Sequence, residues 1–166
     1  FKLLFEYGLA FLTIYTTVFF LIVLLEHRGR LHHSPKATRH PLVSILIPAF
    51  NEEEGIAQTI ESAVKSTYPH KEIIVIDDGS KDKTLEIAKS FSKHGVIVLS
   101  QPNKGKGAAL NNGLRHAKGK LIATLDADSF MEPDAIGKMV GFLEDPKCGA
   151  VTSVMKVFEP HNVLER

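Results

Sequence analysis

The sequence predicts an α/β domain whose mainly parallel sheet is sandwiched by helices, preceded by one transmembrane helix. Between residues 42 and 166, short apolar runs alternate with amphipathic segments, which is the pattern of parallel strands joined by helices. A long apolar stretch stands before them, close to the N-terminus. A chain of 166 residues has room for one domain and such an attachment.

Residues 1–26 are interpreted as the transmembrane helix. The 18 residues from Gly8 to Leu25 carry no charge, and as a helix they would extend about 27 Å, close to the roughly 30 Å hydrocarbon core of a bilayer. Thr13, Thr16 and Thr17 are tolerable there because their hydroxyls can bond to the helix's own carbonyls. A buried core helix would need a larger protein around it. A cleaved signal peptide would need small residues after the run, where charged residues follow instead.

Residues 27–41 are predicted to form a basic, solvated juxtamembrane linker. Residues 26–41 have a net charge of +3, so the positive-inside tendency places the following domain in the cytoplasm. The single cysteine, Cys148, agrees with a reducing compartment and excludes an internal disulfide. Histidines also gather here, without regular spacing to acidic or cysteine ligands, so we expect no metal cluster among them. They are His27, His32, His33 and His40.

The charge of the domain argues against nucleic acid as a partner. The whole chain carries +1, and Lys2 and Glu6 cancel, so the basic linker leaves residues 42–166 at −2. A domain that grips a phosphate backbone normally presents a basic stripe. We therefore expect no nucleic-acid binding.

Four buried strands are expected at residues 43–48, 73–76, 96–99 and 121–125, and a fifth strand is expected to open at 151–154. Asn51 is predicted to cap the first intervening helix, with Glu52, Glu53 and Glu54 in its first turn, where negative charge suits the helix dipole. The apolar faces of the four helices are predicted from residues at helical spacing. These are Ile56, Ile60, Ala63 and Val64, then Leu85, Ala88 and Phe91, then Leu110, Leu114 and Ala117, and finally Ile136, Met139, Val140 and Leu143.

Acidic side chains follow two of these strands. Asp77 and Asp78 end the second strand, and Asp126 and Asp128 follow the fourth. Ligands of open α/β sheets bind beyond the carboxyl ends of the strands, and carboxylates gathered there repel one another unless a cation such as Mg²⁺ or Mn²⁺ is present. We expect Asp126 and Asp128 to point the same way because alternate residues of an extended segment do so. For Asp77, a turn or capping role is the alternative.

The loop from Asn103 to Gly107 contains two lysines and leads into a helix. It lacks the ending of a Walker P-loop. A helix N-terminus nevertheless stabilises anions, so we expect this loop to lie near phosphate; a solvated surface loop is the alternative.

Four ordered segments together resemble a known family. They are Val43–Glu52, Ile74–Ser80, Asn103–Asn111 and Leu125–Asp128, and on them residues 42–158 closely resemble family 2 glycosyltransferases of the GT-A fold. The N-terminal apolar span and the Gly-Lys-Gly-Ala-Ala-Leu-Asn segment look most like membrane-embedded processive synthases of the poly-N-acetylglucosamine, hyaluronan, chitin and cellulose type. Residues 42–166 would then form the nucleotide-sugar-binding half of a GT-A domain.

The resemblance implies a UDP-sugar donor, a divalent metal, and a polysaccharide or lipid-linked acceptor. Phe50 stands where the family often stacks an aromatic, more often Tyr, on uracil, and Asp78 would accept a hydrogen bond from that base. Asp126 would lie near the ribose and a metal-bound water, and Asp128 would bind the metal. The implied nucleotide-sugar site comprises Pro48, Ala49, Phe50, Asn51, Glu52, Asp78, Lys106, Asp126 and Asp128, with Asp126 and Asp128 as the metal ligands.

The same resemblance implies parts that this sequence does not contain. Family members carry a catalytic base in a later acidic motif, and processive members carry a Gln-x-x-Arg-Trp motif. This chain has no Trp and stops at Arg166, so we expect a fragment that binds nucleotide sugar without transferring it. Two alternatives remain: a polyprenyl-phosphate glycosyltransferase of the same fold, and a membrane-tethered, phosphate-receiver-like signalling domain. The latter is disfavoured because Ser100 and Gln101, with no acidic residue, follow the third strand.

Overall fold

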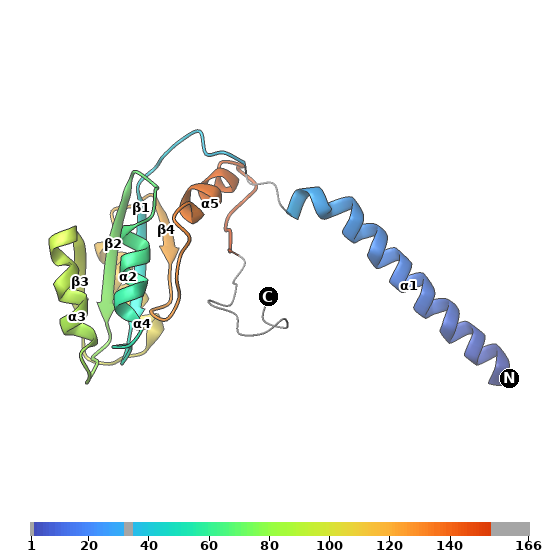
Figure 1. The fold of residues 1–166 in the computed structure, drawn as a ribbon, viewed down its shortest axis with the longest axis horizontal. Helices are drawn as coiled ribbons and strands as arrows, with labels where there is room; N and C mark the ends of the chain where they lie inside the picture. The colour runs from blue at the N-terminus through green and yellow to red at the C-terminus, as the bar shows by residue number, and fades with distance from the viewer. Residues whose placement is uncertain (1, 32–34, 154–166) are drawn as a thin grey trace. The chain divides into compact units, whose positions relative to one another are not determined.

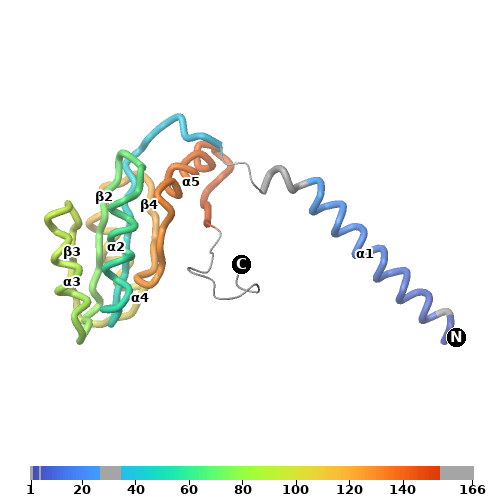
Figure 2. Tube along the Cα trace, viewed as in Figure 1, coloured from blue at the N-terminus to red at the C-terminus, as the bar shows by residue number. Residues whose placement is uncertain are grey.

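The computed structural model describes residues 2–31 and 35–153, which are traced in Figures 1 and 2. The chain divides into two compact units, Phe1–Ser34 and Pro35–Arg166. The first unit is a helix and the second is the α/β domain. Each unit is described by itself.

The first unit is the helix α1, Lys2–Leu31. Its segment Phe5–Glu26, with a mean hydropathy of 2.4, is long and apolar enough to cross a membrane by length and composition. The expected threonine bonds are present: the hydroxyl of Thr13 donates to the carbonyl of Leu9 at 2.9 Å, for example. The helix continues to Leu31, so the first five residues of the predicted linker are helical.

The domain is built on a parallel sheet of four strands, in the order β3-β2-β1-β4. Ala49, Asp77 and Ser100 lie opposite one another at the carboxyl ends of three neighbouring strands, so the loops that follow these strands start from one edge of the sheet. This confirms the predicted parallel α/β architecture. The strands are β1 Val43–Ala49, β2 Lys71–Asp77, β3 Val96–Ser100 and β4 Leu121–Thr124.

Helices cover both faces of this sheet (Figure 1). On one face, α2, α3 and α5 enclose the larger core, centred on Ile45, Ile47 and Val75. On the other face, α4 covers a smaller cluster in which its Ala109 packs with Leu46, Ile74 and Ile76. The helices are α2 Ile56–Val64, α3 Thr84–Ser90, the short 3₁₀ helix η1 Phe91–His94, α4 Lys106–His116 and α5 Ala135–Leu143.

The predicted start of α2 is wrong. Asn51 does not cap the helix, which begins at Ile56 after Gly55. Asn51 instead adopts a left-handed backbone with φ 54°, and its side-chain oxygen accepts a hydrogen bond from the amide of Lys81 at 2.8 Å. The amide of Glu52 likewise donates a hydrogen bond to the hydroxyl of Thr84, the first residue of α3, at 2.8 Å. These bonds to the loop after β2 and to the start of α3 displace the start of α2 by one turn.

The predicted fifth strand is also absent, since residues 151–153 have no strand structure; Val154 lies outside the described residues. A β-branched run forms a strand only where another strand can pair with it. Among residues 35–153, none pairs with this segment.

The face that α4 turns toward the sheet differs from the prediction at Leu114, whose side chain is 46% exposed. The helix packs through Ala109 and Gly113, which are buried. A Cβ atom at Gly113 would lie only 2.8 Å from Cδ1 of Ile76. The close approach of α4 to β2 therefore selects small residues and turns Leu114 outward.

Residues 35–41, called the strap, belong to the same compact unit as the domain and are bonded to it, while Lys36, Thr38, Arg39 and His40 stay exposed. The Glu144 carboxylate, just after α5, accepts hydrogen bonds from the amides of Thr38 and Arg39, each at 2.7 Å, and from the Thr38 hydroxyl at 2.8 Å. The bond from Arg39 and those from Thr38 hold the pKa of Glu144 below its ordinary value. The Tyr68 hydroxyl donates to the carbonyl of Pro41 at 2.8 Å. The strap is thus fixed at several points.

Two glycines of α5 provide a matched test of this packing. A Cβ atom at Gly141 would collide with the carbonyl oxygen of Pro35, whereas one at Gly137 would meet nothing within 4 Å. We predict that Gly141→Ala lowers the free energy of unfolding by about 1–3 kcal/mol through overpacking. Gly137→Ala should raise it by about 0.5–1 kcal/mol, because alanine favours the helix. Urea unfolding of the full chain in detergent, followed by circular dichroism, measures both. Equal stabilisation by the two changes would contradict the docked strap.

Candidate functional site

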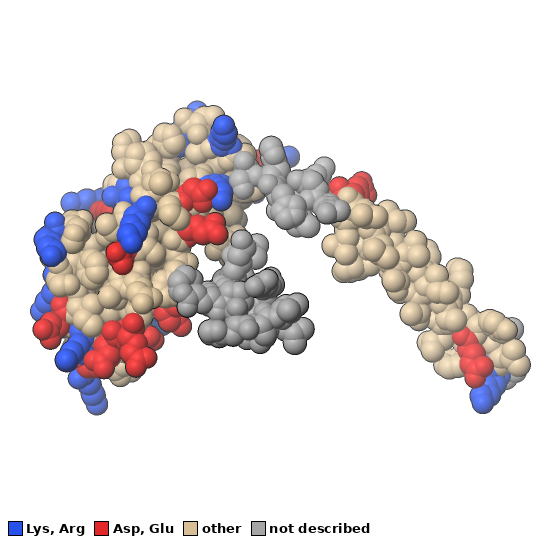
Figure 3. All heavy atoms as spheres, viewed as in Figure 1, with Lys and Arg blue, Asp and Glu red and all other residues tan. Residues whose placement is uncertain are grey.

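A cleft of about 210 Å³ opens beyond the carboxyl ends of the strands. Acidic side chains gather at this end of the domain, which is its lower end in Figure 3. Eight of the nine residues predicted for the nucleotide-sugar site line the cleft, and Asn51 does not. The eight are Pro48, Ala49, Phe50, Glu52, Asp78, Lys106, Asp126 and Asp128.

Asp77 and Asp78 differ sharply in surroundings although they are adjacent. Asp77 is 1% exposed, and its carboxylate accepts hydrogen bonds from the amide of Ser80 at 3.3 Å and the hydroxyl of Ser100 at 3.2 Å. This is the turn role that we considered as the alternative for Asp77. Asp78 is also buried but lies at the cleft.

The carboxylate of Asp78 organises the loop that precedes α4. One oxygen accepts hydrogen bonds from the side-chain amide of Gln101 at 2.8 Å and the backbone amide of Lys104 at 3.0 Å; the other accepts one from the amide of Gly105 at 2.7 Å. Burial disfavours the charged form, but these three hydrogen bonds outweigh it and lower the pKa of Asp78. The carboxylate therefore stays ionised, and its second oxygen, which accepts one hydrogen bond, can accept one more.

Gly79 allows this loop to approach the end of β2. Its φ is +76°, and a Cβ atom would lie 2.7 Å from the amide nitrogen of Asn103. A side chain at this position would therefore both strain the backbone and push away the loop that Asp78 binds.

Lys106 is the first residue of α4 and forms an ion pair with Asp126, with Nζ and Oδ1 2.6 Å apart. Both side chains are more than half exposed, at 61% and 54%, so the pair contributes little to stability. The position of Lys106 matters more, because it places a lysine ammonium group and the N-terminus of α4 at the cleft. Backbone amides at such a terminus favour an anionic ligand.

Asp126 and Asp128 both line the cleft, but the predicted extended conformation of their segment is wrong. The segment is a β-turn rather than an extended chain, closed by a bond from the amide of Ser129 to the carbonyl of Asp126 at 3.0 Å. Ala127 is buried at the corner of the turn. The turn, and not strand alternation, presents both acids to the same side.

Ala109 and Ala127 also line the cleft and were not predicted. Ala109 stands one helical turn after Lys106, so helix periodicity alone could have placed it there. Ala127 gives no chemical signal, and its contribution is that a small side chain fits beneath the turn.

A second hollow, of about 360 Å³, lies along α4 and the loop before it. It is larger than the cleft, but its lining contains no acidic side chain and none of the predicted site residues. Size alone therefore does not identify the functional site. The hollow is lined by Gln101, Lys104, Ala108, Asn111, Asn112 and Arg115.

The donor set suits a hard divalent cation. Asp126 and Asp128 offer carboxylate oxygens, which Mg²⁺ and Mn²⁺ prefer. Within residues 2–31 and 35–153, no three His, Cys, Asp or Glu side chains form a complete ligand cluster. Two protein carboxylates with other positions left for phosphate oxygens and water fit a cation that is bound together with a nucleotide.

Comparison with known proteins identifies the class of this domain. It resembles a solved mannosyltransferase from Pyrobaculum calidifontis in complex with GDP-Man and Mn²⁺, with a TM-score of 0.71 and 27% identity over 82% of this chain and 43% of that one. It also resembles glucosyl-3-phosphoglycerate synthase from Mycobacterium tuberculosis in complex with Mn²⁺, UDP and glucosyl-3-phosphoglycerate, with a TM-score of 0.53 and 31% identity over 62% and 39% of the two chains. The domain is a GT-A glycosyltransferase domain, as its sequence motifs predict.

The chain belongs to glycosyl transferase family 2, whose sequence profile matches residues 44–165. A curated relative, the poly-beta-1,6-N-acetyl-D-glucosamine synthase of Staphylococcus epidermidis, is 38% identical over 125 residues. That alignment covers 74% of this chain and 30% of the synthase. Family membership confirms the predicted resemblance and excludes the phosphate-receiver alternative.

Asp78 provides a test of the site's architecture. Asp78→Asn removes the charge and one acceptor oxygen beside three donors, and we predict a loss of about 1–3 kcal/mol in the free energy of unfolding at pH 7. The pKa of Asp78 is lower in the folded than in the unfolded chain, so its contribution is present above the unfolded pKa and is lost as pH falls through the folded pKa. The difference in the free energy of unfolding between the wild type and Asp78→Asn should therefore become smaller below about pH 4.

Asp126→Asn is the matched control for Asp78→Asn. Its carboxylate is 54% exposed and pairs with Lys106, so the substitution should change stability by less than about 1 kcal/mol. Urea unfolding curves at pH 7 and pH 3 measure both variants. A pH-independent defect in Asp78→Asn would contradict the role of its ionised carboxylate.

Proposed function

We propose that this chain forms the nucleotide-sugar-binding half of a metal-dependent glycosyltransferase that extends a polysaccharide. The observation that carries the proposal is the convergence on one cleft of Asp78, the acidic turn of Asp126 and Asp128, and the N-terminus of α4. These groups can respectively recognise a base, hold a divalent cation and face a diphosphate. The proposed donor is a UDP-sugar.

The base is assigned to the side of the cleft formed by the end of β1. Phe50 follows this strand and is 43% exposed, which leaves a ring face available for stacking. Pro48 and Ala49 contribute backbone beside it. Asp78 has one acceptor position left, which suits the N–H group of a uracil ring.

The diphosphate is assigned to the opposite side, between the acidic turn and α4. Asp128 would hold a divalent cation, with Asp126 near it and near the ribose. Bound there, the cation would supply Lewis-acid stabilisation of charge on the departing nucleoside diphosphate. The two similar structures with Mn²⁺ and a nucleotide support this assignment. Lys106 and the α4 amides would add further positive potential, and Glu52 would lie at the nucleotide rim.

The acceptor is assigned as a growing polysaccharide rather than a polyprenyl phosphate. Identity of 38% to a poly-beta-1,6-N-acetyl-D-glucosamine synthase supports this choice. Because the chain spans 30% of that relative's length, we assign it the donor side of the reaction, and we place no catalytic base among its residues.

The segment Phe5–Glu26 is proposed to anchor the protein in a membrane. Its length and hydropathy permit this, and the basic residues that follow it favour a cytoplasmic position for the domain. A cytoplasmic domain would also meet nucleotide sugars where they are made.

Metal-dependent binding of UDP is the direct test. In calorimetric titrations of the full chain in detergent, we predict that UDP binds with Mn²⁺ present and loses most of its affinity when EDTA replaces the metal. Asp128→Ala should weaken binding about tenfold or more, since even residues that only support metal ligands contribute that much.

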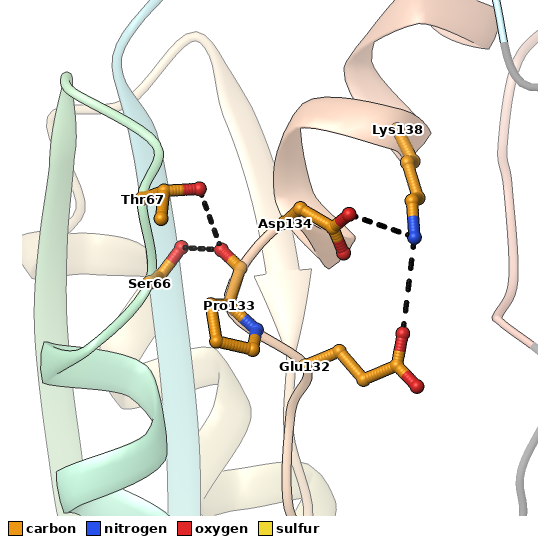
Figure 4. Close-up of polar contacts among 6 residues, drawn as sticks. All are labelled: Ser66, Thr67, Glu132, Pro133, Asp134 and Lys138. Atoms are coloured by element: carbon orange, nitrogen blue, oxygen red, sulfur yellow. Dashed lines mark hydrogen bonds and ion pairs between the residues drawn. The ribbon is translucent and has the colours of Figure 1, made fainter.

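Asp134→Ala is the matched control for Asp128→Ala. Asp134 lies six residues further on and pairs with Lys138 at 2.8 Å, outside the cleft (Figure 4). This variant should bind UDP as the wild type does. Equal binding of UDP with Mn²⁺ and with EDTA would refute the metal assignment.

The single cysteine gives a test of membrane orientation. Cys148 is partly exposed, so its thiol can react with a maleimide. In intact cells that produce the chain, we predict no labelling of Cys148 by a membrane-impermeant maleimide and clear labelling after the membrane is permeabilised. Cys148→Ser gives the background signal. Labelling in intact cells would place the domain outside.

A further inference from the structure

The turn from Asp126 to Ser129, called the acidic turn, can hold a divalent cation as proposed only if its central peptide has a fixed orientation. In a β-turn, the peptide that joins the two central residues differs in orientation by roughly 180° between types I and II. Here that peptide joins Ala127 to Asp128, within the turn closed between Asp126 and Ser129. Its orientation determines the direction in which the Asp128 side chain leaves the backbone. A group that holds the carbonyl of Ala127 in place therefore also fixes the direction of the Asp128 side chain.

A buried hydroxyl of α2 holds this carbonyl. Thr59 is fully buried, and its Oγ1 lies 2.8 Å from the carbonyl oxygen of Ala127 and 3.2 Å from that of Gly55, one helical turn earlier. A threonine hydroxyl has one hydrogen to donate, and the shorter distance assigns it to Ala127. Gly55 adds a steric limit, since a Cβ atom there would lie 3.3 Å from the same carbonyl oxygen.

Other hydroxyls from α2 and the residues just after it hold the loop beyond the turn. Ser62 accepts a hydrogen bond from the amide of Met131 at 3.2 Å, and Ser66 and Thr67 donate to the carbonyl of Pro133 at 3.2 and 3.0 Å (Figure 4). The backbone groups within α2 are occupied by the helix itself, so side chains must satisfy an irregular segment that packs against it. Of these hydroxyls, the one on Thr59 acts inside the turn.

We propose that Thr59 is a positioning residue of the donor site: its hydroxyl fixes the peptide between Ala127 and Asp128, and thereby directs Asp128 into the cleft. The consequence for metal and nucleotide rests on the proposed function, whereas the anchoring of the turn does not. Thr59 does not line the cleft, so it acts through the backbone of Ala127. A purely structural threonine would affect stability without a selective effect on the turn.

Hydrogen exchange of the ligand-free full chain in detergent tests the anchor. Thr59→Val removes the donor and keeps the branched shape, while Thr59→Ser keeps the donor. In the peptide that spans residues 125–131, we predict about tenfold faster exchange in Thr59→Val, because the amide of Ser129, whose hydrogen bond closes the turn, loses protection. Thr59→Ser should resemble the wild type. Thr59→Ala serves the same purpose should the valine variant fail to fold.

The second readout is the affinity of the same variants for UDP in the presence of Mn²⁺, measured by calorimetry on the full chain in detergent. Thr59→Val should weaken binding about 10- to 100-fold, as expected for a residue that orients a metal ligand. Thr67→Val is the matched control, because it removes a hydroxyl that bonds Pro133, five residues after Asp128. It should leave affinity unchanged.

Either of two results overturns the proposal: no change of exchange in Thr59→Val, or an equal loss of affinity in Thr67→Val. Binding of UDP by the wild type that is indifferent to EDTA would instead refute the proposed metal site. In that case the exchange measurement alone decides whether Thr59 anchors the turn.

Discussion

Loops that follow parallel strands leave backbone donors and acceptors that the sheet cannot use, and side chains must bind them. Asp78 meets the largest share of this need at the cleft, because its carboxylate accepts from Gln101, Lys104 and Gly105. The loop after β3 is thereby bound to the end of β2, and α4 begins where that loop ends. The position of the helix N-terminus, and hence of Lys106, depends on one buried carboxylate.

The four aspartates at the carboxyl ends of β2 and β4 are stabilised in different ways. Asp77 receives hydrogen bonds from a hydroxyl and an amide, and Asp126 receives the ammonium of Lys106. Asp128 is exposed, and its carboxylate accepts a long hydrogen bond from the hydroxyl of Ser129 at 3.3 Å. Asp128 is thus the carboxylate of this group that is least compensated by the protein, which agrees with its proposed role. A cation that also binds Asp126 would compete there with Lys106.

Much of the fold could be predicted from the sequence because buried parallel strands appear as continuous apolar runs, as in β1 and β2. The parallel order then brings the ends of those strands to one edge, so residues such as Asp78 and Asp128 meet although they are far apart in sequence. What could not be predicted depended on distant partners. Glu144 binds Thr38 across 106 positions, and no local pattern signals such a contact.

Predictions from local sequence preference were also wrong where a tertiary contact and a helical role compete for the same residue. Asn51 is a good helix cap by type, but its side chain and backbone are used by the loop after β2. Leu114 fits a helical apolar stripe, yet α4 packs against the sheet through Gly113, close to Ile76, and this orientation leaves Leu114 exposed. In both cases the tertiary contact, rather than intrinsic preference, determined the result.

The strap also determines how mechanical load would travel through the protein. Residues 32–34 connect α1 to it, and the strap is held by Glu144 at the end of α5 before the chain enters β1. Along the chain, tension applied through α1 would therefore reach the hydrogen bonds between the strap and Glu144 before it reached β1.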